Sequence, residues 1–211
     1  MAAALGAEYG QVGFGRQGFT ITGNGQVPPF FTPGVEANST WNKVYESTPR
    51  SFREIDYIFI LHGTNDGLNI ASCPQAGVVA SCEGWLHAVR AAAGADTAIF
   101  LVVPFGGFGT KNAPVNALPS AFAAYQKASP ADKKTYLIDL GAEAAQGLEC
   151  GGWMRGCRGA YGTSAIGSSL AGCDGIHPRG GTNETARHGE LGAMLVVKAA
   201  LALAGVPGLL D

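Results

Sequence analysis

Two short motifs in this sequence carry side chains that suit acyl-transfer chemistry. The first is Gly63-Thr64-Asn65-Asp66, which follows the apolar run that ends at Leu61. An asparagine at the carboxyl end of a strand can aim its side-chain N–H into the crevice there and stabilise a developing oxyanion. Glycine, asparagine and aspartate are also common turn formers, so this motif alone equally describes a strand-to-loop turn.

The second motif is Asp174-Gly175-Ile176-His177-Pro178, near the carboxyl end of the chain. A carboxylate three residues before a histidine can accept its Nδ1–H, which fixes the tautomer and leaves Nε2 as a general base. Such a pair arises often by chance. Alone, it is also explained by a loop aspartate capping a turn beside a surface histidine.

A glycine-rich loop precedes both motifs, with the spacing Gly13-x-Gly15-x-x-Gly18. This spacing matches a dinucleotide-binding loop, but the residues after Gly18 do not favour a helix and no acidic ribose partner follows a next strand. We therefore expect no nucleotide cofactor. Glycines here would instead let a backbone N–H approach a ligand closely.

The order of these three motifs resembles that of SGNH (GDSL-type) hydrolases, a family of ester hydrolases, from about residue 8 to the end. The resemblance implies that Gly18, or Gly15 as the second choice, supplies a backbone oxyanion donor and Asn65 a side-chain donor. It implies His177 as general base and Asp174 as its orienting carboxylate. The text around the glycine loop is most similar to members acting on carbohydrate esters, such as acetylated polysaccharides.

The sequence departs from the family pattern in one respect, because no Gly-Asp-Ser occurs in it. In the family that motif ends the first strand and supplies the nucleophilic serine. A strand with its crossover helix needs roughly 30 residues, and an expected strand near Tyr9 leaves eight before it. We therefore expect the chain to begin inside the first crossover helix, with the first strand and the nucleophile outside it. Ser168 and Ser169 are the weaker candidates, since they lie in a glycine-rich loop.

The elements expected to position these motifs alternate between strands and helices. Apolar runs predict strands at 8–14, 56–61, 98–103 and 135–140. Helical patterns predict three helices: one that begins after Ser81 as its N-cap, one over 117–128 and one over about 183–204. This alternation predicts one α/β domain over 1–211 with a mainly parallel sheet. The family resemblance implies a three-layer α/β/α, flavodoxin-like arrangement. In such sheets the site lies at the carboxyl ends of the strands.

Composition and charge indicate which classes of binding partner and which cellular setting to expect. The net charge is −2 with scattered Lys and Arg, which disfavours nucleic acid. No apolar run approaches the ~18 residues of a membrane span, and the first five residues do not read as a secretory signal. The five cysteines lack zinc spacing, so we expect no metal. The pairs Cys73–Cys82 and Cys150–Cys157 could each close a local disulfide, which would suit a secreted protein.

Together these features predict a serine-type carboxylic ester hydrolase acting on a small-molecule or carbohydrate ester, without a cofactor. The alternative is an inactive SGNH-fold carbohydrate-binding module or a decayed fragment. A sheet lacking a strand would also favour homo-oligomers formed through exposed strand edges. His62, beside the Gly-Thr-Asn-Asp motif, is expected to shape the pocket by packing.

Overall fold

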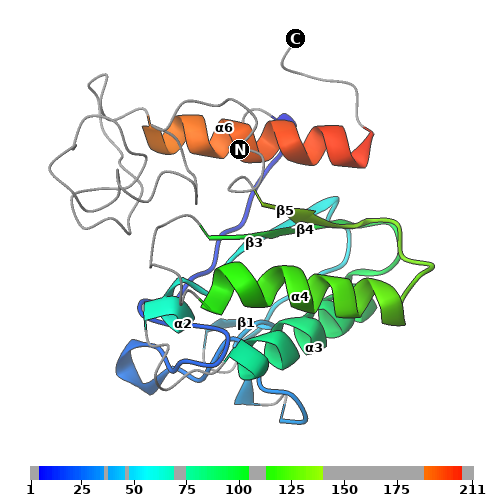
Figure 1. The fold of residues 1–211 in the computed structure, drawn as a ribbon. Helices are drawn as coiled ribbons and strands as arrows, with labels where there is room; N and C mark the ends of the chain where they lie inside the picture. Colours follow the sequence, from blue (N-terminus) through cyan, green and yellow to red (C-terminus); the bar gives the residue numbers. More distant parts are fainter. Residues whose placement is uncertain are drawn as a thin grey trace, which may run out of the picture. The chain divides into compact units, whose positions relative to one another are not determined.

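A computed structural model gives the fold and describes residues 5–35, 38–45, 48–68, 75–104, 113–139 and 188–205. It is an α/β structure (Figure 1). The chain groups into two compact units, one of 11–104 with 111–137, and one of 1–10, 105–110 and 138–211. The prediction of a single domain stays a prediction.

A three-stranded parallel sheet forms the centre of the larger unit, in the order β3–β4–β5. The strands are β3 (Tyr57–Leu61), β4 (Ala98–Val102) and β5 (Thr135–Ile138), which confirms three of the expected strands. Every side chain of β4 is buried, as expected for the central strand of a parallel sheet.

The fourth expected strand, 8–14, is wrong. These residues form no strand, and the side chain of Tyr9 is 79% exposed. A strand requires a neighbour to bond with its backbone, and no other described strand lies beside β3 on its outer side. The apolar pattern of 8–14 therefore has no partner among the described residues.

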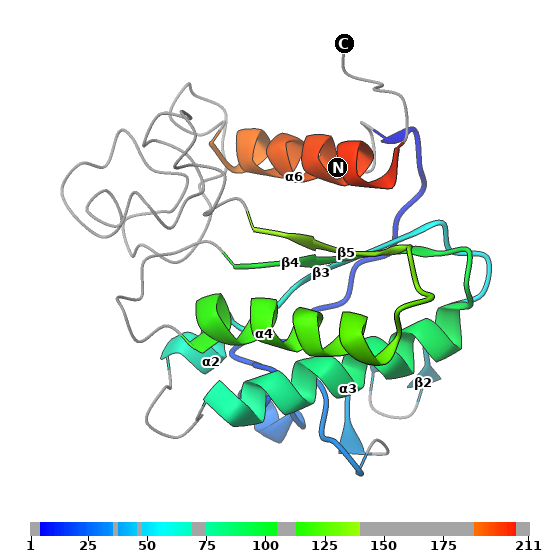
Figure 2. The ribbon, with the colours of Figure 1, turned by 45° about the vertical axis from the view of Figure 1, so that its right-hand side comes forward.

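One face of the sheet is covered by α3 (Gln75–Ala93) and α4 (Ala113–Ala128), which pack against each other (Figure 2). The core between helices and sheet includes buried apolar side chains from both layers: Val78, Leu86, Val89, Ile99, Leu101 and Leu118. Strand residues alternate between faces, so Phe100 points to the other face. There it stacks on Phe59 and Tyr136, from the two neighbouring strands.

Two expectations about α3 are wrong. The helix begins at Gln75, so Ser81 lies inside it rather than capping it. The buried Ser81 hydroxyl contacts the carbonyl oxygens of Phe19 and Phe31 at 3.2 and 2.6 Å, and so ties the preceding loop to the helix. Cys82 is free and fully buried, so the Cys73–Cys82 disulfide does not form. The Cys150–Cys157 pair lies outside the described residues.

The segment before β3 is mostly irregular. It contains a 3-10 turn, η1 (Asn24–Gln26), and a short antiparallel pair of β1 (Lys43–Tyr45) and β2 (Thr48–Pro49). The buried Gln17 amide secures this segment, donating to the Pro28 carbonyl and the Thr40 hydroxyl, both at 2.6 Å. The segment is also anchored by three side chains that are buried in the hydrophobic core: Phe31, Trp41 and Phe52.

The last helix, α6 (His188–Ala204), belongs to the smaller unit and matches the expected helix from residue 188 onward. Its Val196, Val197, Ala200 and Leu201 are buried. Residues 183–187 lie outside the described part. No described helix combines the length and the hydropathy that a membrane crossing requires.

Candidate functional site

The Gly-Thr-Asn-Asp motif lies at the carboxyl end of β3, where the sequence places it. Gly63 has φ of +105°, a conformation that side-chain-bearing residues rarely adopt, so the chain can turn sharply out of the strand. The motif then opens the short helix α2 (Thr64–Leu68) rather than a loop. This turn directs Asn65 and Asp66 back toward the glycine-rich loop, as their contacts show.

Asp66 anchors that loop. Its carboxylate is fully buried and accepts hydrogen bonds from the Phe19 N–H at 2.6 Å and from the Thr20 N–H and hydroxyl at 2.9 Å. A buried carboxylate is costly unless it is hydrogen-bonded, and these donors meet that need. Sequence reasoning gave Asp66 no role beyond a turn former, although its position next to Asn65 was a signal.

Asn65 lies against the same loop. Its Nδ2 donates to the Gln17 carbonyl at 3.0 Å, joining residues that are 48 apart in the sequence. An amide nitrogen carries two N–H donors at fixed angles, so one bond orients the whole group. The structure thus brings together two of the three motifs, the glycine loop and the Gly-Thr-Asn-Asp motif that carries Asn65.

Gly18 and Gly15, the candidate backbone donors, differ in their surroundings. Gly18 is buried and its N–H already donates to the Ile21 carbonyl at 2.9 Å. A Cβ on Gly18 would lie 2.7 Å from the Asp66 Cγ, which explains why this position requires glycine. Gly15 is exposed, and its N–H has no hydrogen-bond partner among the residues that the structure describes.

His62 packs beside these residues. Its ring lies 4.5 Å from the Phe30 ring and 5.3 Å from the Phe19 ring, centroid to centroid. Burial lowers its pKa, against the raising effects of the Asp66 charge and of a hydrogen bond to the Gly18 backbone. The packing role that the sequence suggested is therefore observed.

The Asp-Gly-Ile-His-Pro motif cannot be placed. Asp174 and His177, and the serine candidates Ser168 and Ser169, lie outside the described residues. Their predicted roles stay predictions.

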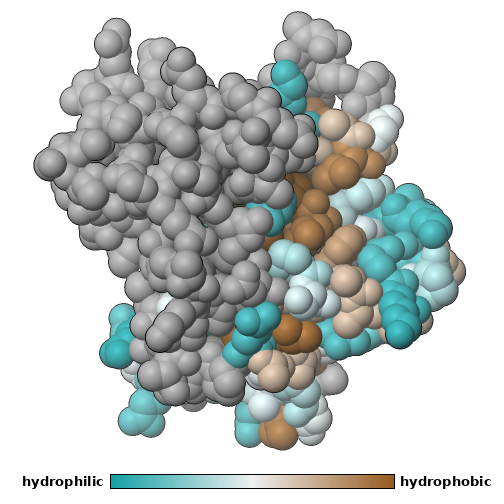
Figure 3. All heavy atoms as spheres, in the orientation of Figure 1, coloured by the Kyte–Doolittle hydropathy of each residue, from teal (hydrophilic) through white to brown (hydrophobic). Residues whose placement is uncertain are grey.

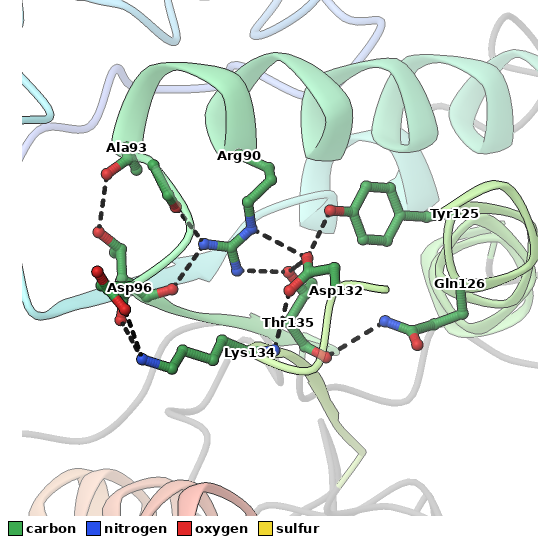
Figure 4. A network of polar contacts seen from close by, with 10 residues as sticks. Arg90, Ala93, Asp96, Tyr125, Gln126, Asp132, Lys134 and Thr135 are labelled. Atoms are coloured by element: carbon green, nitrogen blue, oxygen red, sulfur yellow. Dashed lines mark hydrogen bonds and ion pairs between the residues drawn. The ribbon is translucent and has the colours of Figure 1, made fainter. Parts of the chain in front are cut away.

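A second polar cluster (Figure 4) lies near the amino ends of β4 and β5. The Gly-Thr-Asn-Asp motif follows the carboxyl end of the parallel strand β3, so the two groups lie at opposite ends of the strands. The Arg90 guanidinium of α3 pairs with Asp132 at 2.9 Å, and Tyr125 and Thr135 also donate to that carboxylate. Burial raises the pKa of Tyr125, with a further contribution from Asp132. These groups bond to one another, which suits a structural joint rather than a reaction centre.

No group of three metal-ligating side chains comes together within the described ranges. Comparisons with family models, curated proteins and solved structures found no match. The chemistry of the site therefore rests on its own residues: an oriented amide, a clamped glycine loop and a shielded imidazole at the carboxyl end of a strand.

Proposed function

We propose that this chain carries the oxyanion-binding part of a serine-type carboxylic ester hydrolase of the SGNH kind. The observation that carries the proposal is the bond from the Asn65 amide to the Gln17 carbonyl. It sets an oriented N–H donor group beside the glycine loop, at the sheet edge where parallel α/β folds place their sites. The order of the three motifs along the chain is the ground for proposing the SGNH family.

In the proposed reaction a serine attacks the ester carbonyl while His177 takes the hydroxyl proton, with Asp174 holding the histidine tautomer. The Asn65 amide and one backbone N–H of the loop stabilise the tetrahedral oxyanion. Gly15 suits the backbone role better than Gly18, because Gly15 is an exposed residue whose N–H has no partner among the described residues, whereas the Gly18 N–H is already bonded. The alcohol then leaves with the proton that His177 returns, and water hydrolyses the acyl-serine to release the acid.

The proposal takes the nucleophile from a Gly-Asp-Ser segment beyond the 211 residues. A strand carrying that segment would pair with the outer edge of β3, which bonds only to β4 among the described strands. The carboxyl end of that added strand, with its serine, would then lie beside the carboxyl end of β3, which Asn65 follows. In the full arrangement, helices on both faces of the sheet would complete three layers. The proposed substrate is a carbohydrate ester, with no cofactor.

The test uses a longer protein that contains this chain behind a strand ending in Gly-Asp-Ser. We expect it to hydrolyse a short-chain aryl acetate and an acetylated polysaccharide, and to form a phosphonate adduct on the Gly-Asp-Ser serine. Exchanging that serine or His177 for alanine should abolish turnover. Binding of the polysaccharide without turnover or adduct would contradict the proposal and favour a carbohydrate-binding module.

A further inference from the structure

Arg16 occupies a turn position that disfavours its residue type. The turn from Phe14 to Gln17 is closed by the Gln17 N–H, which donates to the Phe14 carbonyl at 3.3 Å. Gly15 has no positive φ, whereas Arg16 has φ of +63°. This order of signs is that of a type II turn, whose third residue is usually glycine or asparagine. An arginine there is strained, because its Cβ lies too close to the following carbonyl.

The neighbouring backbone explains the conformation of the turn but not the choice of arginine. The Gly15 carbonyl accepts the Asn24 N–H at 2.9 Å, which fixes the peptide that joins Gly15 to Arg16. On the other side, the buried Gln17 amide donates to two acceptors at 2.6 Å. The turn therefore requires a positive φ at residue 16. Glycine or asparagine would meet that requirement with less strain, so we look for a use of the arginine side chain.

The charge of Arg16 stands alone in this part of the sequence. It is the only charged residue between Glu8 and Glu36. Its side chain is exposed, and its guanidinium has no hydrogen bond or ion pair within the described ranges. The partly buried Arg90, by contrast, pairs with Asp132 at 2.9 Å. The five donors of the Arg16 guanidinium are therefore available to a ligand.

The position of Arg16 places this charge beside the candidate oxyanion donors. The next residue, Gln17, supplies the carbonyl that accepts the Asn65 amide at 3.0 Å. The preceding residue, Gly15, carries the N–H without a described partner. Both the Gly15 N–H and the Arg16 side chain are donors, so this turn favours a negatively charged group.

We propose that Arg16 determines specificity for a carbohydrate ester that carries a carboxylate close to the scissile ester, with the guanidinium binding that carboxylate. The planar guanidinium matches a carboxylate through two parallel N–H···O bonds, which a lysine could not supply. This role rests on the proposed function, because it deepens the substrate class of the same site. The rigid turn keeps the base of the side chain fixed, which lowers the entropic cost of the contact.

Binding to residues 1–211 tests the carboxylate without requiring turnover. Isotope-labelled protein is titrated with three trisaccharides: one of galacturonic acid, the neutral galactose counterpart and a sulfated galactose counterpart. We expect the uronate to bind about tenfold more tightly than the neutral sugar and to shift the Arg16 Nε–H signal, assigned by its loss in Arg16→Gln. The preference should weaken as salt is added and should disappear in Arg16→Gln. Arg53→Gln, at another exposed arginine, should retain it.

Equal binding of the uronate and the neutral sugar, or a preference that survives Arg16→Gln, would overturn the proposal. Equally tight binding of the sulfated sugar would overturn the assignment to a carboxylate. If the longer protein with its serine proves inactive, the esterase assignment fails while this binding result still decides the role of Arg16. If the longer protein is active, Arg16→Gln should raise KM for an acetylated uronate oligosaccharide about tenfold, and a loss confined to kcat would contradict a specificity role.

Urea unfolding tests whether the strained arginine serves stability instead. Asparagine tolerates a positive φ better than arginine or glutamine does, so Arg16→Asn should raise the urea midpoint while it removes the preference for the uronate. Gln26→Asn is the matched control, because Gln26 is also exposed and has φ of +61°. It should raise the midpoint similarly and leave the preference intact. A lower midpoint in Arg16→Asn would assign the side chain a structural role and contradict the proposal.

Discussion

At the scale of single residues, the Asn65 amide has the most direct expected effect. In the longer protein with its serine, Asn65→Ala should lower kcat about 100- to 1000-fold, or roughly 3–4 kcal/mol, because one preorganised oxyanion donor is lost. Steady-state kinetics on an aryl acetate measure it, with exposed Asn38→Ala as an unaffected control. A change confined to KM would make Asn65 a substrate contact instead.

Gly18→Ala tests the close packing between the glycine loop and α2. The added Cβ would lie 2.7 Å from the Asp66 Cγ, so either the carboxylate moves or the loop shifts. We expect a loss of about 1–3 kcal/mol in the free energy of unfolding, measured with urea. Gly13→Ala is the matched control, since its Cβ would meet nothing within 4 Å. Equal stability of the two variants would contradict the observed packing.

Part of the site follows from sequence alone. Asn65 and the glycine loop could be expected to meet, because Asn65 follows a strand and the motif order resembles that of a family in which both motifs supply oxyanion donors. The buried hydrogen bonds that Asp66 accepts could not, since they depend on how a loop without regular structure folds over α2. The same holds for the Gly18 N–H, which the local turn to Ile21 occupies.

At the scale of elements, the Arg90–Asp132 cluster should join α3, α4 and β5. Burial by itself would raise the pKa of Asp132, but bonds donated by Thr135, Tyr125, the Lys134 N–H and Arg90 together lower it. The folded protein therefore holds the charged form more strongly than the unfolded chain does. This stability is fully present above the unfolded pKa of about 3.9 and is lost as the pH falls through the lower folded value.

Asp132→Asn should accordingly reduce the free energy of unfolding at neutral pH by about 1.5–3 kcal/mol. The difference from the unaltered protein should shrink as the pH falls below about 4. Urea unfolding across pH measures both effects. Asp96→Asn is the control, since its ion pair with Lys134 is exposed and should contribute little. The turn at 129–134 is hydrophilic (Figure 3), and its Lys133 and Lys134 are exposed to solvent. A pH-independent loss in Asp132→Asn would contradict the charge argument.

The elements that were predicted correctly from the sequence are those whose own residues are apolar enough to require burial. The runs that became β3, β4 and β5 are apolar enough to be strands in any α/β context. Residues 8–14 (EYGQVGF) are less apolar and contain two glycines, so their state depends on a partner strand, and none lies beside them among the described residues. Ser81 looked like a cap because serine suits that position, whereas its hydroxyl serves the buried loop carbonyls of Phe19 and Phe31.

At the scale of the whole molecule, the outer edge of β3 should favour self-association. This apolar strand pairs only with β4 among the described strands, and Leu61 at its end is 41% exposed. We expect sedimentation velocity to show association that grows with protein concentration, and Leu61→Lys to weaken it. Leu203→Lys, at a leucine of α6 that is 47% exposed, should leave it unchanged. Association insensitive to Leu61→Lys would exclude this edge as the contact.

The whole chain of 211 residues should by itself be nearly inactive as an esterase. Oxyanion donors and a base without a serine on a strand-to-helix elbow leave only attack by water, which is far slower than a complete triad. The measurement is hydrolysis of an aryl acetate by residues 1–211, followed by treatment with a serine-directed phosphonate and mass analysis of the adduct. Adding the strand that ends in Gly-Asp-Ser should raise both turnover and the free energy of unfolding, because it supplies the nucleophile and covers the β3 edge. Saturable turnover of the shorter chain, with an adduct on Ser168 or Ser169, would instead place the nucleophile in the loop before Asp174.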